Sequence, residues 1–210
     1  MTCVSCVVFI ECMESKEANA PPPETVSVAE FQEVQAPLYG EIRLTEREQF
    51  PLDLVERLVD APSWSRADAD FVLLDLPIDE DLQRYLHSLA HAFSIDYALL
   101  LAVIETESSF TPDIVSGNCY GLMQIHTINH EWLSNHLGIS DFLDPYENTL
   151  AGVTVLRGLF DSYDTTEQVL MAYNCGESGA KNLWQQNIFT TSYTKKVVEK
   201  SLKYQELLGE

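Results

Sequence analysis

Apolar residues recur at helical spacing through the second half of the chain. Between residues 79 and 93 they are three or four positions apart, the spacing of one helix face, and they are Leu82, Tyr85, Leu86, Leu89, Ala90 and Phe93. The next run, 97–104, is apolar on nearly every side and predicts a buried central helix, with Asp96 in position to cap its first turn. We therefore expect two successive helices at the centre of a domain.

Similar signals predict three further helices. The stretch Asp144-Pro-Tyr-Glu147 combines a capping aspartate, a proline at the first helical position and a glutamate at the third. The helix that it starts carries its apolar residues inward, namely Leu150, Val153, Leu156, Phe160 and Tyr163. We expect a short helix over 167–173 that ends in Asn174-Cys-Gly176, and a final amphipathic helix over 193–208. Strand patterns are nearly absent after residue 76, so the sequence predicts an all-α fold.

The chain is expected to have three parts. Residues 1–35 have the composition of a disordered segment, with an acidic, proline-containing stretch around Pro21-Pro-Pro23. Their apolar patch, Val7-Val-Phe-Ile10, lacks a positive leader and is not a convincing export signal, although it fits the remnant of a signal peptide or anchor. No apolar run reaches transmembrane length. Residues 36–76 are expected to form an extension that packs on the main domain, residues 77–208.

The net charge narrows the range of partners. A formal charge of −21 argues against nucleic acid or an anionic membrane surface as a partner of the domain. From Tyr85 to Leu156 there is no lysine or arginine, so this region has no basic groove for phosphates. Recognition by this chain should therefore rest on neutral contacts, hydrogen bonds and stacking.

The central helix ends in two carboxylates that face different ways. Glu107 follows Val103 and Ile104 at helical spacing, which places it on an apolar stripe. Desolvation there, together with the negative end of the helix dipole, should raise the pKa of Glu107, as a general acid near neutral pH requires. Glu105 lies about 200° round the helix and points elsewhere. Pro112 indicates that the helix ends nearby.

Several short motifs in this order resemble those of the soluble lytic transglycosylases. The matching residues are Glu107-Ser108, Ser116, Gly121-Leu-Met-Gln-Ile125, Ala172-Tyr-Asn-x-Gly176 and Tyr193. The resemblance extends over roughly 79–203, and it implies a lysozyme-like, mainly helical domain with a catalytic cleft. Members of that family cleave the glycan strands of peptidoglycan, so the resemblance also implies a location in the cell envelope or outside the cell.

The resemblance implies a mechanism with one carboxylate and no cofactor. Glu107 would protonate the glycosidic oxygen of a MurNAc–GlcNAc link and then, as a carboxylate, accept the proton of the C6 hydroxyl. Intramolecular attack gives a 1,6-anhydro end. A goose-type lysozyme that hydrolyses the same bond is an alternative, with Asp113 or Glu105 as its second carboxylate. The other alternative is a non-catalytic glycan-binding module of a wall-spanning secretion, conjugation or phage apparatus.

The resemblance also assigns substrate-binding positions. Gln124 would line the sugar groove, and Asn174 would contact sugar or brace Glu107, whereas Tyr173 is either a site residue or part of the core. Tyr193 would point its hydroxyl at Glu107, although Phe189 replaces the acidic residue that the family has a few positions earlier. Ser116 matches the family's loop serine, with an interval to Gly121 that is one residue shorter.

Cysteines and histidines leave further possibilities open. Cys119 and Cys175 lie in two separate motifs and are interpreted as small buried residues, with a disulfide between them as the alternative. Histidine pairs at i, i+4 spacing occur at His87 and His91 and again at 126 and 130. Neither pair has the intervening glutamate of the metalloprotease motif, so we interpret them as surface or packing residues and expect no metal.

Overall fold

The computed structural model describes residues 70–209, and the predicted segment 1–35 and most of the predicted extension lie outside this range. The elements are α3 (Glu80–Ala92), α4 (Tyr97–Ser108), β1 (Val115–Ser116), β2 (Cys119–Tyr120), β3 (Ile125–His126), the 3-10 helix η3 (Thr127–Asn129), α5 (His130–Leu137), α6 (Pro145–Ser162), α7 (Thr166–Gln185) and α8 (Ser192–Leu208). The helical class predicted from the sequence is confirmed.

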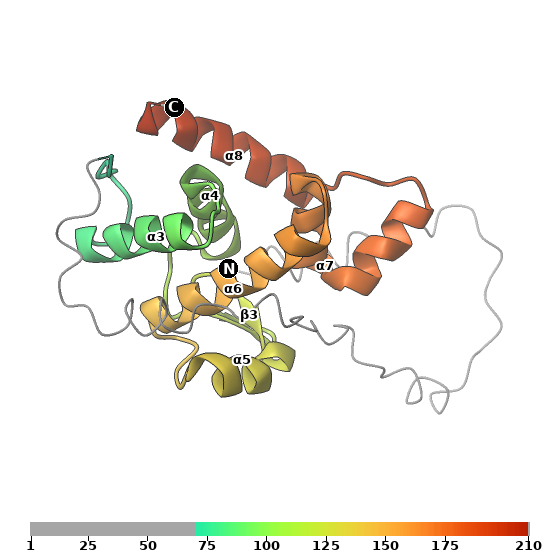
Figure 1. The fold of residues 1–210 in the computed structure, drawn as a ribbon, viewed down its shortest axis with the longest axis horizontal. Coiled ribbons are helices and arrows are strands. Elements are labelled where there is room, and N and C mark those ends of the chain that lie inside the picture. Colours follow the sequence, from blue (N-terminus) through green and yellow to red (C-terminus); the bar gives the residue numbers. More distant parts are fainter. Residues whose placement is uncertain (1–69, 210) are drawn as a thin grey trace.

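Helix α4 is the buried centre of the domain, as its apolar run predicts. All of its residues except Glu105 are buried, and the side chain of Asp96 accepts a hydrogen bond from the Leu99 amide at 2.6 Å, which caps the first turn. Helix α8 packs along α4 more extensively than any other element does, and α3 also contacts α4. In Figure 1, α8 runs across the domain next to α4, α6 lies on the other side of α4, and α7 also contacts α8.

Helix α3 presents the predicted apolar stripe to α4 and α6. Asp79 caps it by accepting a hydrogen bond from the Leu82 amide at 2.8 Å. Before the helix, residues 71–76 form neither helix nor strand, but they are fastened to it. The Leu74 amide donates to Oε1 of Gln83 at 3.0 Å, and Nε2 of Gln83 donates to the Leu74 carbonyl at 3.1 Å.

The predicted start of α6 is confirmed. Asp144 accepts hydrogen bonds from the amides of Tyr146 and Glu147 at 2.9 and 2.8 Å, and Pro145 occupies the first turn. The helix ends at Ser162, one residue before the last predicted inward position.

One prediction about local structure is wrong. The helix expected to end at Gly176 instead bends there and continues, so α7 runs from Thr166 to Gln185 with Gly176 at φ 71° and ψ 159°. This conformation is open almost only to glycine, which explains how one residue can redirect a helix without ending it.

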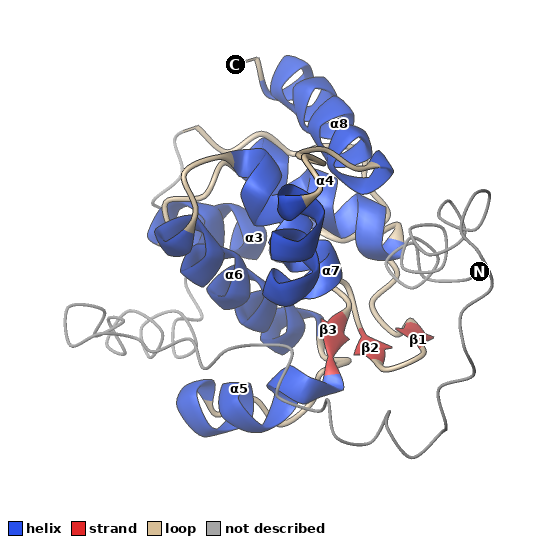
Figure 2. Cartoon of the chain, turned by 90° about the vertical axis from the view of Figure 1, so that its right-hand side faces the viewer, coloured by secondary structure: helices blue, strands red, loops and turns tan. Residues whose placement is uncertain are grey.

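A small antiparallel sheet in the order β1-β2-β3 follows α4. Its two-residue strands are too short for an alternating pattern. Figure 2 shows this sheet near α5, at the end of the domain away from α8.

Within residues 70–209, no helix is both long and apolar enough to cross a membrane.

Candidate active site

Glu107 lies in the last turn of α4, and its carboxyl group meets the hydroxyl group of Tyr193. Tyr193 donates a hydrogen bond to Oε1 of Glu107 at 2.7 Å, and the two side chains are 3% and 1% exposed. A capping box at the start of α8 holds Tyr193 in place, because Thr191 and Thr194 exchange hydrogen bonds between side chain and backbone on either side of it. The contact that the family resemblance implied is therefore present.

Glu105 has a different environment from Glu107, as the helical wheel predicts. Oε2 of Glu105 accepts a hydrogen bond from the Tyr204 hydroxyl at 2.9 Å, and Oε1 pairs with Nζ of Lys200 at 2.7 Å. Burial, followed by the hydrogen bond to Glu105, raises the pKa of Tyr204 above its ordinary value. Glu105 is thus a paired carboxylate that joins α4 to α8.

The Gly121–Ile125 motif forms a tight turn that leads into β3, so Gln124 is not part of a helix. Gln124 has φ 50° and is 6% exposed. Its Nε2 donates to the Gly121 carbonyl at 2.8 Å and to the Ile114 carbonyl at 3.3 Å, so the side chain folds back over its own turn. Gly121 itself has φ 73°, a conformation that favours glycine.

Asn148, a residue of α6 that the sequence reasoning missed, holds this turn against the domain. Its fully buried amide donates to the carbonyls of Tyr120 and Phe142, both at 2.8 Å, and accepts from the Met123 amide at 2.8 Å. Asn148 lies about 200° round the helix from Leu150 and off the predicted inward stripe, so no local signal in the sequence marks it.

Helix α7 also holds the turn. The hydroxyl of Tyr173 donates a hydrogen bond to the Met123 carbonyl at 2.8 Å, and the ring packs against the core. The neighbouring residue, Asn174, is half-buried. Nδ2 of Asn174 and Oε1 of Gln124 are both buried and have no hydrogen-bond partner among residues 70–209.

The sequence model of the Transglycosylase SLT domain matches residues 84–197, more than half of the chain. The chain belongs to the Transglycosylase SLT domain family.

Two relatives of the SLT domain extend the comparison. A protein named "Transglycosylase" from Enterobacteria phage PRD1 is 32% identical over 108 residues, which cover 51% of this chain and 38% of that protein. The X-ray structure of an inactive Glu-to-Gln mutant of lytic transglycosylase Slt from Pseudomonas aeruginosa superimposes with a TM-score of 0.54 at 19% identity. That match covers 80% of this chain and 30% of Slt. The chain thus spans well under half the length of either relative, and the likeness to Slt confirms the predicted lysozyme-like fold.

Three other residues considered in the sequence analysis, Ser116, Asp113 and Phe189, differ in their exposure to solvent. Ser116 is half-buried in β1, and Asp113 is exposed in the turn that precedes this strand. Phe189, which stands where the family has an acidic residue, is 54% exposed. The roles of Ser116, Gln124, Tyr173 and Asn174 in substrate binding stay predictions.

The two cysteines of the SLT motifs are not joined by a disulfide. Cys119 is buried, which agrees with the preferred interpretation, whereas Cys175 is half-buried and donates from Sγ to the Met171 carbonyl at 3.0 Å.

Proposed function

We propose that this SLT domain cleaves the MurNAc-β-1,4-GlcNAc bond of peptidoglycan and forms 1,6-anhydro-MurNAc ends. The observation that carries the proposal is the buried carboxyl group of Glu107, held by the Tyr193 hydroxyl at 2.7 Å. Burial favours the protonated form of a carboxyl group, which is the form that a general acid needs. The position at the C-terminal end of α4 acts in the same direction.

The reaction needs only one carboxylate. Glu107 donates its proton to the glycosidic oxygen as the bond from C1 of the muramic sugar to that oxygen breaks. The resulting carboxylate accepts the proton of the C6 hydroxyl, whose oxygen forms the new bond to C1. The proton count balances and no water is consumed, so no second carboxylate has to activate one. Tyr193 keeps Oε1 of Glu107 in one place through both proton transfers.

Four further residues are proposed to form the sugar site. Gln124 and Asn174 supply amide groups, and the buried atoms of these two amides that have no partner in residues 70–209 support an assignment to substrate. Ser116 is proposed as a sugar contact from the small sheet. Tyr173 acts on the site through the turn, because its hydroxyl holds the Met123 carbonyl.

The two relatives support the choice of substrate and catalyst. Slt from Pseudomonas aeruginosa is a lytic transglycosylase, and its Glu-to-Gln mutant is inactive. The phage PRD1 relative bears the name transglycosylase. We infer that the domain acts on the wall, in the cell envelope or outside the cell, with a wall-spanning secretion, conjugation or phage apparatus as the proposed partner.

Mass spectrometry of the soluble products from purified peptidoglycan tests the proposal. Anhydro-muropeptides, each lighter by one water than the hydrolysed form, are the expected products. The Glu107→Gln variant should release none of them while it still binds glycan. Glu105→Gln is the matched control on the same helix and should retain turnover. Ordinary reducing ends would mean a lysozyme, and no products from several types of wall would mean a binding module.

A further inference from the structure

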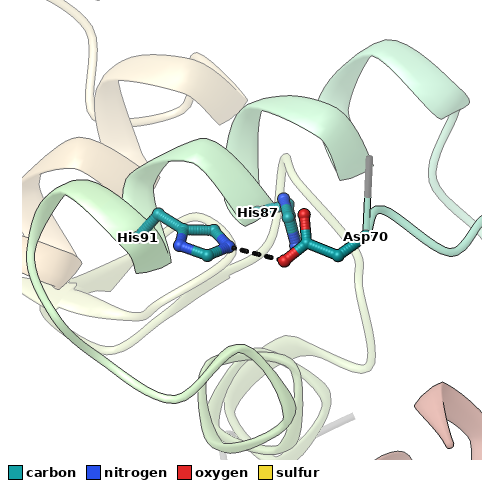
Figure 3. A group of neighbouring side chains, drawn as sticks. All are labelled: Asp70, His87 and His91. Carbon is teal, nitrogen blue, oxygen red and sulfur yellow. Dashed lines mark ion pairs between the residues drawn. The ribbon is translucent and has the colours of Figure 1, made fainter. Parts of the chain in front are cut away.

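Three potential metal ligands meet at α3, away from the carboxyl group of Glu107 at the far end of α4. They are His87 and His91, which lie on one face of the helix, and Asp70, from the segment before it (Figure 3). One ligand atom from each lies within 4.8 Å of the other two. We propose that these three residues bind a divalent transition metal, with Zn²⁺ as the best fit.

The spacing is close to that of a tetrahedral zinc site. Zinc bonds to imidazole nitrogen and carboxylate oxygen are about 2.0–2.1 Å long, which places neighbouring ligand atoms roughly 3.3 Å apart. Nε2 of His91 lies 3.6 Å from Oδ2 of Asp70. The side chains of these two residues are 60% and 69% exposed, so small rotations can bring all three ligand atoms to the bonding distance.

The third ligand is already fixed in position. His87 is 5% exposed, and its ring makes edge contacts with Phe71 and Tyr97 at centroid distances of 5.6 and 5.0 Å. The ring of His91 follows one helical turn later, at 4.6 Å. A rigid buried ligand beside two adaptable exposed ones lowers the entropy lost on binding and leaves a path for the ion to enter.

The chemistry of the ligands favours zinc over calcium or magnesium. Two imidazoles and one carboxylate suit zinc and similar transition metals, whereas calcium and magnesium take oxygen ligands. Three protein ligands leave a fourth tetrahedral position for a water molecule or another ligand. From the sequence, the two histidines are interpreted as surface or packing residues because the glutamate of the metalloprotease motif is missing between them. The structure supplies that ligand in Asp70.

The second histidine pair does not offer the same chemistry. Nδ1 of His126 accepts a hydrogen bond from the Ile128 amide at 3.2 Å. Nε2 of His130 lies 3.2 Å from the Ile125 carbonyl, and its ring stacks on Phe142 at 3.6 Å. Both rings are thus committed to local contacts, and within residues 70–209 the group at Asp70 is the one found with three clustered ligands.

A bound ion would fasten residue 70 to α3. Through the contact between His87 and Tyr97 it would also support the first turn of α4, the helix that carries Glu107. Because the metal binds the folded form, it should raise the thermal unfolding midpoint of the protein.

Titration of the full chain with ZnCl₂ by isothermal calorimetry tests the site. Cys3→Ser, Cys6→Ser and Cys12→Ser are introduced first, because these thiols can bind zinc by themselves. One equivalent of Zn²⁺ should bind. In a separate thermal melt, the bound ion should raise the thermal unfolding midpoint. His91→Gln and Asp70→Asn change exposed side chains and should each weaken binding by about tenfold or more. His136→Gln is the matched control at an exposed histidine on α5 and should leave the affinity unchanged.

Cobalt substitution identifies the ligands independently. Co²⁺ at this site should give the visible bands of a four-coordinate nitrogen and oxygen site, and these bands should be lost in His91→Gln. A sulfur-to-cobalt charge-transfer band would place the ion at Cys119 or Cys175 and overturn the proposal. Equal Zn²⁺ affinity of His91→Gln and the parent protein, or no Zn²⁺ binding by the parent, would overturn it as well. Neither readout involves peptidoglycan, so the result does not depend on the proposed function.

Discussion

The hydroxyl of Tyr204 donates a hydrogen bond to Oε2 of Glu105, a residue 99 positions earlier in the chain. Tyr193 makes the equivalent contact with Glu107. The two glutamates point to opposite sides of α4, since two residues correspond to about 200° of a helix. The two tyrosines are eleven residues, or about three turns, apart and therefore share one face of α8. Helix α8 thus runs along one side of α4 and contacts both glutamates of its last turns (Figure 1).

Replacing Tyr193 by phenylalanine removes only one hydroxyl group, but it should impair catalysis. The substitution keeps the buried ring but leaves Oε1 of Glu107 without this donor, at a cost of about 1–3 kcal/mol in unfolding free energy. Because Oε1 of Glu107 loses this contact, turnover should fall by about tenfold or more, equivalent to roughly 1.4 kcal/mol in the barrier. Urea denaturation and release of muropeptides measure the two effects. Wild-type turnover by this variant would contradict a positioning role for Tyr193.

Replacing Tyr204 by phenylalanine should affect stability alone. Glu105 keeps its ion pair with Lys200 and is 34% exposed, so water can replace the lost donor. The expected loss is about 0.5–1.5 kcal/mol in unfolding free energy, with unchanged turnover per folded molecule. The same two assays apply. A loss of turnover as large as that of Tyr193→Phe would mean that α8 acts on Glu107 as a single rigid body.

Two glycines with nearly equal backbone angles should respond differently to alanine. Gly121 and Gly138 have φ values of 73° and 72°, which cost an alanine about 1 kcal/mol at either site. A Cβ at Gly121 would lie 2.6 Å from the Phe142 carbonyl oxygen, whereas at Gly138 nothing lies within 4 Å. Gly121→Ala should therefore lose a further ~1–3 kcal/mol in unfolding free energy. Equal losses in urea denaturation would show that the turn can move aside.

Acid should remove the contribution that the Glu177 carboxylate makes to the free energy of unfolding. Glu177 directly follows Gly176, where α7 bends. Oε2 of Glu177 accepts a hydrogen bond from Tyr163 at 2.7 Å and pairs with Lys181 at 2.9 Å. Burial raises the pKa of Glu177, but the hydrogen bonds from Lys181 and Tyr163 outweigh it and hold the pKa below its ordinary 4.5. Burial and the bond to Glu177 also raise the pKa of Tyr163 to about 12.

Glu177→Gln is the variant that tests this pair. A carboxyl group whose pKa is lower in the folded protein stabilises it above its unfolded pKa and stops doing so as the pH falls through the folded one. The wild type should exceed Glu177→Gln by about 0.2–1 kcal/mol at pH near 7, the range of exposed ion pairs. The difference should vanish well below pH 4.5. If the wild type stays more stable than Glu177→Gln in acid, the added stability comes from packing of the side chain and not from its charge.

The features predicted correctly from the sequence are those fixed within one helical turn. Asp96 and Asp144 were identifiable as caps because each binds amides two or three residues ahead. The buried helix α4 was identifiable because its residues are apolar on all sides. The different environments of Glu105 and Glu107 followed from the helical wheel alone.

The features missed depend on contacts between distant segments. Gly176 resembles a helix end in sequence, and only the packing of residues beyond it, such as Ala180, shows that the helix resumes. Two of the three hydrogen bonds of Asn148 join α6 to residues 25 and 28 positions earlier, so no local pattern contains them. Asp70 meets two histidines of α3 only in the folded chain.

The pairing of Glu107 with Tyr193 also sets an order of events during synthesis. The two residues are 86 positions apart, and α8 follows every other helix of residues 70–209. A nascent chain that already contains α3 to α7 still lacks the hydroxyl group that holds the carboxyl. Under the proposed function, wall-cleaving activity would appear only when the last helix of the domain has left the ribosome and docked on α4, so incomplete chains would be harmless to the cell that makes them.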